Sequence, residues 1–219
     1  MIDPAKLIDS LVVLGHPKNK SNPKTRDSRL WVYDRVVVFD PEIIVKQLEI
    51  ARKMVVNATW AGKNILIICE KMFYKDSIES LSKDCSFHYL NHKVPSGVLT
   101  NFDTLLSRIK SLKALRAYVE WDFFSTLTKK EQSMKKRELL KIEKVYKWVS
   151  ELKKKPDLVI IVDGQMMHKF VLEVEKMDTP AIVLASSNFD KILEDSCVVT
   201  CNTNSFKSLD ILMWTMFWK

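Results

Sequence analysis

Five consecutive apolar residues, Leu158–Val162, stand in the stretch PDLVIIVDG, residues 156–164. They do not alternate with polar residues, which is typical of a β-strand buried on both faces of a parallel sheet. Three lysines at 153–155 precede Pro156, a pattern that ends a helix before a proline and places cations at its negative end. The stretch therefore predicts the end of a helix followed by a central strand.

Apolar runs of the same kind recur along the chain and predict further strands, at 36–39, 65–68 and 181–184, with weaker ones at 87–90 and 197–199. Helical segments separate them, at 41–61, 75–83, 166–177 and 205–217. The first begins with Asp40-Pro41-Glu42, which supplies a cap, a proline at the first helical position and an acid near the positive end. This alternation predicts a three-layer α/β sandwich around a parallel sheet of about five strands.

Residues 102–152 break the alternation, because apolar residues recur there at helical spacing and no strand pattern appears. Two helices joined around 121–130 predict an antiparallel hairpin, with Ile142, Val145, Val149 and Leu152 on the inner side of the second helix. Just before it, Gly97 marks a turn, and the side chain of Thr100 or Asn101 is expected to cap the first helix. Asp103 then stands in its first turn.

The net charge of the chain is +8, and it is concentrated in one region. Residues 101–155 hold 15 Lys and Arg against 7 Asp and Glu, whereas the remainder holds 20 against 20. We therefore divide the chain into an α/β body, residues 1–100 and 156–219, and a basic hairpin, residues 101–155. A localised excess of cations points to a polyanionic partner, which can be nucleic acid, an anionic membrane surface or an acidic protein.

The sequence lacks several motifs that are typical of enzymes and of membrane proteins. There is no glycine-rich phosphate loop and no nucleophile motif, and no apolar run approaches the length of a membrane span. The first residues lack the pattern of a signal peptide or of an amphipathic presequence, so neither is expected. Cys69, Cys85, Cys197 and Cys201 lack the spacing of a zinc site and are expected to be reduced. We expect no catalytic residue, no metal and no cofactor.

The four histidines and one carboxylate are the candidate functional groups of the body. His16, His88, His92 and His168 are expected to have structural or surface roles. Asp163, directly after the central strand, is expected to cap the helix that follows, which Gly164 and Gln165 open. The alternative is a nucleotide- or flavin-binding α/β enzyme that uses Asp163 with His16 and Asn188. A second alternative is an adaptor that binds an anionic membrane or a protein through the basic hairpin.

Several separated motifs resemble the small-subunit ribosomal protein S-two family in its bacterial and organellar form. They are Gly15-His16, Asn22-Pro23-Lys24, Ser96-Gly97-Val98-Leu99-Thr100-Asn101, Leu127-Thr128-Lys129-Lys130-Glu131, and Pro156-Asp157 before a strand that ends in Val162-Asp163. The chain departs from the family pattern at Thr25, at His92 to Ser96, and at Ser186-Ser187-Asn188. The departures and the low number of glycines favour an organellar ribosome.

The resemblance implies a flavodoxin-like sheet with a protruding helical hairpin and a structural role in translation. Its implied partners are small-subunit ribosomal RNA, neighbouring ribosomal proteins and, where it exists, an S-one-type messenger-binding protein; no small-molecule substrate is expected. The implied location is the mitochondrial ribosome, with the plastid or the bacterial cytoplasm as alternatives. Asn101 is expected to be a cap rather than an RNA ligand. About half of the following cations are expected to contact RNA phosphates: Lys18, Lys20, Lys24, Arg26, Arg29, Lys93, Arg108, Lys110, Lys129, Lys130, Lys135, Lys136 and Arg137.

Overall fold

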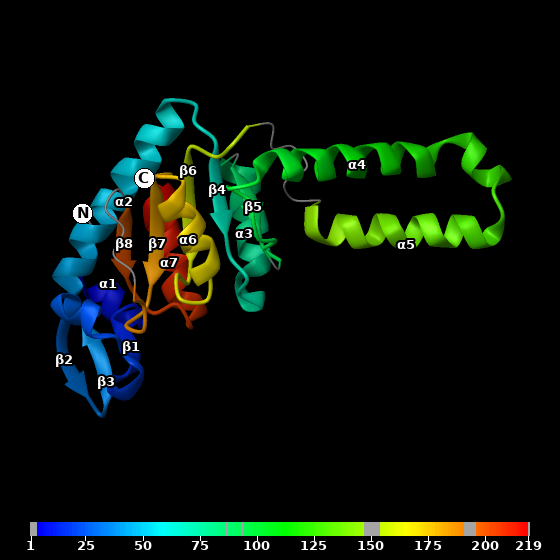
Figure 1. Cartoon of the computed structure of the whole chain (residues 1–219). Coiled ribbons are helices and arrows are strands. Elements are labelled where there is room, and N and C mark those ends of the chain that lie inside the picture. Colours follow the sequence, from blue (N-terminus) through cyan, green and yellow to red (C-terminus); the bar gives the residue numbers. More distant parts are fainter. Residues whose placement is uncertain (1–3, 86, 93, 147–153, 191–195, 219) are drawn as a thin grey trace.

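The computed structural model describes residues 4–85, 87–92, 94–146, 154–190 and 196–218 of the chain. They form an α/β body from which two long antiparallel helices project to one side (Figure 1). The side chains of residues 122, 123 and 145 lie outside the description.

Five parallel strands form the main sheet, in the order β5-β4-β6-β7-β8. Their bounds are β4 (Ile65–Ile68), β5 (His88–Leu90), β6 (Leu158–Val162), β7 (Ala181–Ala185) and β8 (Cys197–Thr200). The first strand along the chain lies between the second and the third, which is the flavodoxin-like order. Every residue of β4, β6 and β7 is buried, so the predicted fold class and the unalternating central strands are confirmed.

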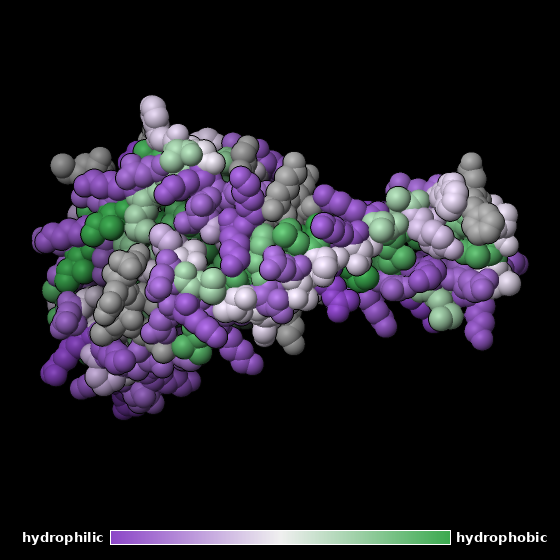
Figure 2. Space-filling model, turned by 45° about the horizontal axis from the view of Figure 1, so that its top comes forward, coloured by the Kyte–Doolittle hydropathy of each residue, from purple (hydrophilic) through white to green (hydrophobic). Residues whose placement is uncertain are grey.

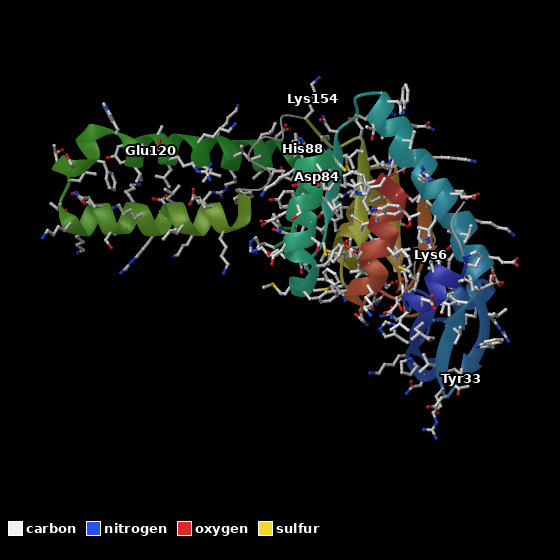
Figure 3. The ribbon with its side chains drawn as sticks, turned by 180° about the vertical axis from the view of Figure 1, so that it is seen from behind. Lys6, Tyr33, Asp84, His88, Glu120 and Lys154 are labelled. Atoms are coloured by element: carbon white, nitrogen blue, oxygen red, sulfur yellow. The ribbon has the colours of Figure 1, made fainter. Side chains whose placement is uncertain are left out.

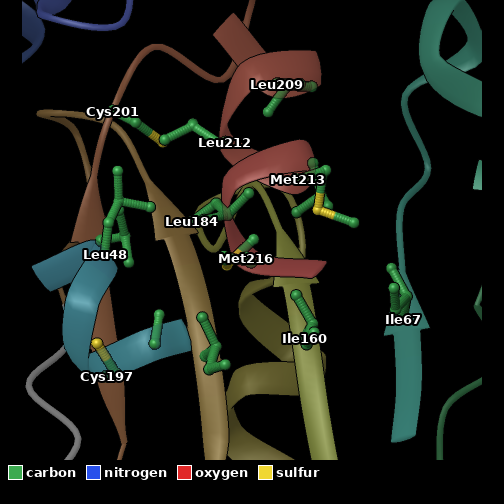
Figure 4. Close-up of a cluster of buried hydrophobic side chains, with 14 of the residues drawn as sticks. Leu48, Ile67, Ile160, Leu184, Cys197, Cys201, Leu209, Leu212, Met213 and Met216 are labelled. Atoms are coloured by element: carbon green, nitrogen blue, oxygen red, sulfur yellow. The ribbon is translucent and has the colours of Figure 1, made fainter. Parts of the chain in front are cut away.

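Helices cover both faces of this sheet (Figure 1). One face packs against α1 (Pro4–Asp9), α2 (Pro41–Trp60), α3 (Lys75–Cys85) and α7 (Phe206–Phe217). Figure 4 shows how Leu48 of α2 and Leu212 and Met216 of α7 close over Ile160 and Leu184 of the sheet. The other face packs against α6 (His168–Lys176) and the first turns of α4 (Phe102–Glu120). The short 3-10 helix η3 (Met72–Tyr74) leads into α3.

A second, antiparallel sheet lies beside the body, with the order β1-β3-β2. It consists of β1 (Leu14–Pro17), β2 (Arg29–Tyr33) and β3 (Val36–Phe39), with the 3-10 helices η1 (Lys18–Lys20) and η2 (Pro23–Ser28) between β1 and β2. The prediction that 36–39 is buried on both faces of the parallel sheet is wrong, because its burial alternates along the strand. β2 and β3 are joined by Asp34 and Arg35, both at positive φ, and this tight turn makes the pair antiparallel.

The predicted hairpin is confirmed as α4, the 3-10 helix η4 (Asp122–Thr126) and α5 (Lys129–Tyr146), which together we call the arm. Thr128 and Glu131 bond reciprocally at the start of α5: the Thr128 hydroxyl donates to Glu131 Oε2 over 2.7 Å, and the Glu131 backbone N–H donates to Thr128 Oγ1 over 3.4 Å. Across the hairpin, Arg116 Nε lies 2.7 Å from Glu143 Oε1. Val149 and Leu152, predicted on the inner side, lie outside the described residues.

Helix starts were predicted with mixed success. Asp40 caps α2 as expected, since its Oδ1 accepts from the Glu42 N–H over 2.9 Å. Asn101 stands at the N-cap of α4, but the predicted bond from its side chain to a helix N–H is wrong. Its Oδ1 accepts instead from the Thr104 hydroxyl over 2.7 Å. The helix predicted from residue 166 begins at His168, because a turn that Asp163 caps precedes it.

Candidate nucleic-acid interface

The surface of the arm carries cations with no acidic partner in the described part of the chain. Among the described side chains of α5 none is buried, because one face of this helix meets α4 and the rest meets solvent. Figure 2 shows hydrophilic side chains over much of the visible face of the arm. Five predicted phosphate contacts are exposed there without an ion pair: Arg108, Lys110, Lys129, Lys130 and Arg137.

Two other predicted contacts on α5 are already engaged within the arm. Lys135 Nζ lies 3.0 Å from Glu138 Oε2, in an exposed pair that contributes little to stability. Lys136 Nζ lies 5.7 Å from the centre of the Phe124 ring, which itself packs edge-on against Tyr118. These contacts hold the tip of the arm together, and both lysines still reach solvent.

The root of the arm is built into the body. Phe102, Leu105 and Ile109 are buried in the cluster on the second face of the sheet. Directly before α4, the Glu173 carboxylate of α6 accepts from the N–H of Gly97 over 2.6 Å and of Leu99 over 3.1 Å. Gly97 has φ +87°, a conformation that glycine adopts without steric cost. The body therefore fixes the direction in which the arm leaves it.

Glu173 was not anticipated from the sequence. It reads as one polar residue on the exposed side of an amphipathic helix, and no local pattern links it to a loop 76 positions away. The only sequence signal lies on the other partner, where Gly97 indicates a turn whose N–H groups need an acceptor.

The cations of the N-terminal loop, residues 18–29, lie away from the arm. Lys18, Lys20, Lys24 and Arg26 are exposed, and Lys24 Nζ also donates to the Asp190 carbonyl over 2.9 Å. Arg29 is half-buried, with its guanidinium donating to the Asn22 carbonyl and to Thr25 Oγ1. Its role is thus at least partly to hold the loop.

Two of the thirteen predicted RNA contacts are set apart from the others. One guanidinium nitrogen of Arg29 donates to two acceptors inside the protein, and Lys93 lies outside the described residues. The other cations fall into two separate groups. Figure 3 labels Tyr33 on the small sheet next to the N-terminal loop and Glu120 on the arm, at opposite ends of the molecule.

At the carboxyl ends of the strands, Lys71 and Asp163 form a nearly buried ion pair. Lys71 Nζ lies 2.6 Å from Asp163 Oδ2 and donates to Asn204 Oδ1 over 2.8 Å. The Thr203 hydroxyl donates to the same carboxylate oxygen over 3.2 Å, and Asp163 Oδ1 accepts from the Met166 N–H over 3.1 Å. Asp163 therefore caps the turn that precedes α6 and not, as predicted, the helix itself, because α6 begins only at His168. Its partners Lys71, Thr203 and Asn204 were not anticipated.

His16 lies beside this pair. Its Nδ1 is 2.8 Å from Ser186 Oγ, and its Nε2 is 3.4 Å from Asn204 Nδ2. Burial lowers the pKa of His16 from its ordinary value, and Lys71 and Lys20 lower it further while Asp163 opposes them. The fold thus gathers His16 and Asp163 at one edge, as the alternative of an α/β enzyme requires. Here, however, a lysine of the chain itself neutralises the carboxylate.

A pocket of about 410 Å³ opens next to the same edge, between the loop at 94–96 and residues 166–170, which are the end of a turn and the start of α6. Glu70 and Glu173 line it together with His168 and Lys169. Both carboxylates already accept backbone N–H groups of the loop, Glu70 from Val94 over 2.6 Å. Two carboxylates against a single lysine are unfavourable for a nucleotide phosphate.

The four cysteines are free thiols. Cys69, Cys197 and Cys201 are buried in the core, and burial raises the pKa of Cys69 and of Cys197 to about 11, which keeps both thiols protonated. Within the described ranges, no three His, Cys, Asp or Glu side chains are placed to hold a metal ion. None of the described helices has the length and apolar character needed to cross a bilayer.

The chain is similar in sequence to a family of known proteins. The profile of the family described as "Ribosomal protein S2" matches residues 7–217. The protein named small ribosomal subunit protein uS2c of Cyanidium caldarium is 26% identical over 95% of this chain and 86% of its own. The uS2 protein of Picosynechococcus sp. is 28% identical over 95% and 81%, and that of Coprothermobacter proteolyticus is 30% identical over 87% and 71%.

Proposed function

This chain belongs to the ribosomal protein S2 family and is a structural constituent of the small ribosomal subunit, and from that premise we propose that its arm binds phosphates of the small-subunit ribosomal RNA. The observation that carries the proposal is the set of exposed, unpaired cations on the arm. A lysine or arginine that meets a phosphate releases condensed counterions, which provides affinity without reading sequence.

The distribution of charge supports the arm rather than the body as the RNA contact. Residues 101–155 carry the whole net charge of +8, and the arm within them holds 11 Lys and Arg against 6 Asp and Glu, whereas the remainder of the chain is neutral. A projecting element whose root is fixed by Glu173 and by the buried Phe102 can hold its cations at a set distance from the body. The neutral body is then available for neighbouring ribosomal proteins.

We further propose that the ribosome concerned is organellar and in the first place mitochondrial, with a plastid or a bacterial cytoplasm as the alternatives. The departures from the family pattern at Ser96 and at 186–188 and the total of 4 glycines support this proposal. Fractionation of native cells tests it, since the chain is then expected in the mitochondrial fraction with the small subunit. Recovery of the chain only from cytosolic or plastid ribosomes would contradict it.

Salt-dependent RNA binding tests the role of the arm. One variant replaces the five unpaired arm cations Arg108, Lys110, Lys129, Lys130 and Arg137 by alanine. The matched control replaces five exposed lysines of the body: Lys6, Lys46, Lys53, Lys63 and Lys83. Both variants lose the same charge, so only the position of the cations differs.

Binding of each variant to the cognate small-subunit RNA is measured between about 50 and 200 mM salt. Each phosphate contact contributes roughly 0.7 to 0.9 to the slope of log affinity against log salt. With about half of the cations in contact, we expect the arm variant to lose about 2 from this slope and at least about tenfold in affinity at low salt. Equal losses in the two variants would show that the arm is not the contact.

A further inference from the structure

The strand β2 forms a free edge of the small sheet. Within the described part of the chain it pairs with β3 alone, and Figure 1 shows it on the outside of the molecule. Its last four residues are all apolar or aromatic and exposed: Leu30 by 50%, Trp31 by 60%, Val32 by 44% and Tyr33 by 75%. Their outward N–H and C=O groups and side chains therefore meet solvent in the isolated chain.

Such an edge is unusual for a chain that acts alone. Proteins protect edge strands with lysine, proline or a covering loop, because an apolar edge pairs readily with another chain. Residues 30–33 hold neither lysine nor proline, and the register shifts only once, between Arg29 and Trp31. At the other side of the sheet the body protects β1, where the His16 N–H donates to Ser187 Oγ over 2.8 Å.

A large open pocket of about 970 Å³ adjoins the same strand. Pro17, Val32 and Val36 provide its apolar lining, and Lys18, Lys20 and Arg35 provide its charged rim against the single acid Asp34. The N-terminal loop and β2 up to Arg35 carry six cations and two acids, a net charge of +4 over residues 18–35. The surface beside the free edge is therefore both apolar and positive.

We propose that an extended, acidic segment of a neighbouring small-subunit protein adds to the edge of β2 as a fourth strand. A peptide backbone can satisfy the alternating N–H and C=O groups of the edge together, whereas RNA phosphates only accept hydrogen bonds. Trp31 and Tyr33 then contact alternate side chains of the segment on one face of the sheet. Acidic residues of the segment pair with Lys18, Lys20 and Arg35 at the pocket. The inference rests on the proposed function, which supplies the neighbouring protein.

Photo-crosslinking in the assembled subunit tests the inference. A photoreactive phenylalanine replaces Val32 in the full chain, and the control carries it at Ile50, which is 53% exposed on α2. The small subunits are purified by sedimentation before irradiation. We expect position 32 to crosslink to a protein segment rich in Asp and Glu, and position 50 not to crosslink to that segment.

Other crosslinking results overturn the inference in distinguishable ways. A crosslink to ribosomal RNA, to a second copy of this chain, or to nothing would reject the strand partner while leaving the ribosomal role intact. Failure of the chain to sediment with the small subunit at all would reject the proposed function and the inference together.

A second variant tests the edge itself. V32K places a lysine on the strand, which blocks pairing as natural edges do, and the control I50K adds the same charge on α2. We expect V32K subunits to keep this chain but to lose the crosslinked neighbour at least about threefold by quantitative mass spectrometry, and I50K subunits to keep both. Circular dichroism of the free chain checks that V32K folds. Unchanged occupancy of the neighbour in folded V32K would overturn the inference.

Discussion

Lys71 Nζ lies 2.6 Å from Asp163 Oδ2, with only 13% and 10% of the two side chains exposed. Lys71 follows β4 and Asp163 follows β6, so the pair stands where the flavodoxin-like strand order reverses. In parallel sheets of this order ligands bind in the crevice at that point. In this chain the Lys71 side chain lies at that point, and its ion pair with Asp163 links the carboxyl ends of β4 and β6.

Breaking this ion pair is expected to destabilise the fold. Lys71→Met leaves the Asp163 carboxylate nearly buried without its cation, which costs about 3 kcal/mol in the free energy of unfolding. Asp163→Asn, which tolerates the positive φ of 69° at this position, is expected to cost a similar amount. Urea denaturation measures both, and Lys135→Met, which breaks an exposed pair, is the control with an expected loss under about 1 kcal/mol.

The double variant measures the interaction energy between Lys71 and Asp163 apart from their contacts with other residues. Lys71→Met with Asp163→Asn removes both charges, so its loss of stability is expected to be clearly smaller than the sum of the two single losses. If the losses were additive, the two side chains would stabilise the fold independently. That result would contradict an interaction through the short contact between them.

Glu173 is expected to hold the root of the arm. Glu173→Ala leaves the N–H groups of Gly97 and Leu99 without their acceptor and is expected to lower the free energy of unfolding by about 1 to 3 kcal/mol. Hydrogen exchange measured by NMR provides the specific test, because these two amides are expected to exchange faster. Glu49→Ala on the exposed side of α2 is the control, and equal exchange at Gly97 in both variants would contradict the role of Glu173.

Shortening the arm is expected to leave the body folded. The Arg116–Glu143 contact shows that these residues lie opposite one another, so residues 117–142 can be replaced by Gly-Ser-Gly. This keeps Phe102, Leu105 and Ile109 in the core, whereas removal of all of 102–152 would take them out. We expect a change of only a few degrees in the melting temperature.

The shortened chain also tests whether the outer arm contributes to association with the small subunit. It lacks Lys129, Lys130 and Arg137 and is expected to associate more weakly with the small subunit in sedimentation. If association were unchanged, the outer arm would not be a contact. If the melting transition were lost, the outer arm would belong to the folding unit of the body.

His16 is expected to make stability fall at low pH. Burial lowers its pKa in the folded chain below the ordinary value of 6.5, so the unfolded chain binds the proton more readily. The contribution to stability is complete above pH 6.5 and is lost as the pH falls below it. We expect the drop in unfolding free energy between pH 7.5 and 5 to be smaller in His16→Gln than in the unmodified chain.

His92 provides the comparison for this pH effect. Burial also lowers the pKa of His92, with Lys75 and Lys144 contributing in the same direction. His92→Gln is therefore expected to reduce the drop as well, and the double variant to reduce it further. A drop of unchanged size in all three variants would assign the pH dependence to other groups.

Local patterns predicted the parts of the fold that depend on neighbouring residues. The unalternating run at Leu158–Val162 indicated a strand buried on both faces, and Asp40-Pro41-Glu42 indicated the start of α2; both are confirmed. The arm was predicted from helical spacing and from its charge for the same reason. Side-chain burial within one element and backbone capping depend on residues that are close together in sequence, so a local pattern can predict them.

The small sheet was missed because its strands are defined by pairing. Leu14–Pro17 has no strong apolar pattern of its own. Leu30–Tyr33 is a short apolar run, and Val36–Phe39 looks like a parallel strand until its partners are known. The turn at Asp34 and Arg35 lacks the glycine that usually marks a two-residue hairpin. A strand's sheet and direction depend on which edges meet, and that is settled by the packing of the whole body.

By itself, the sequence determined the parallel sheet, the helices that cover it, the basic arm and the family to which the chain is similar. Only the tertiary structure decided that Lys71 neutralises Asp163, that Glu173 holds Gly97 and Leu99, that Arg29 is engaged inside the N-terminal loop, and that β2 is left with a free edge. The first group follows from periodicity and charge along the chain. The second consists of contacts between residues far apart in sequence, which form only when the folded backbone brings those side chains within a few ångströms.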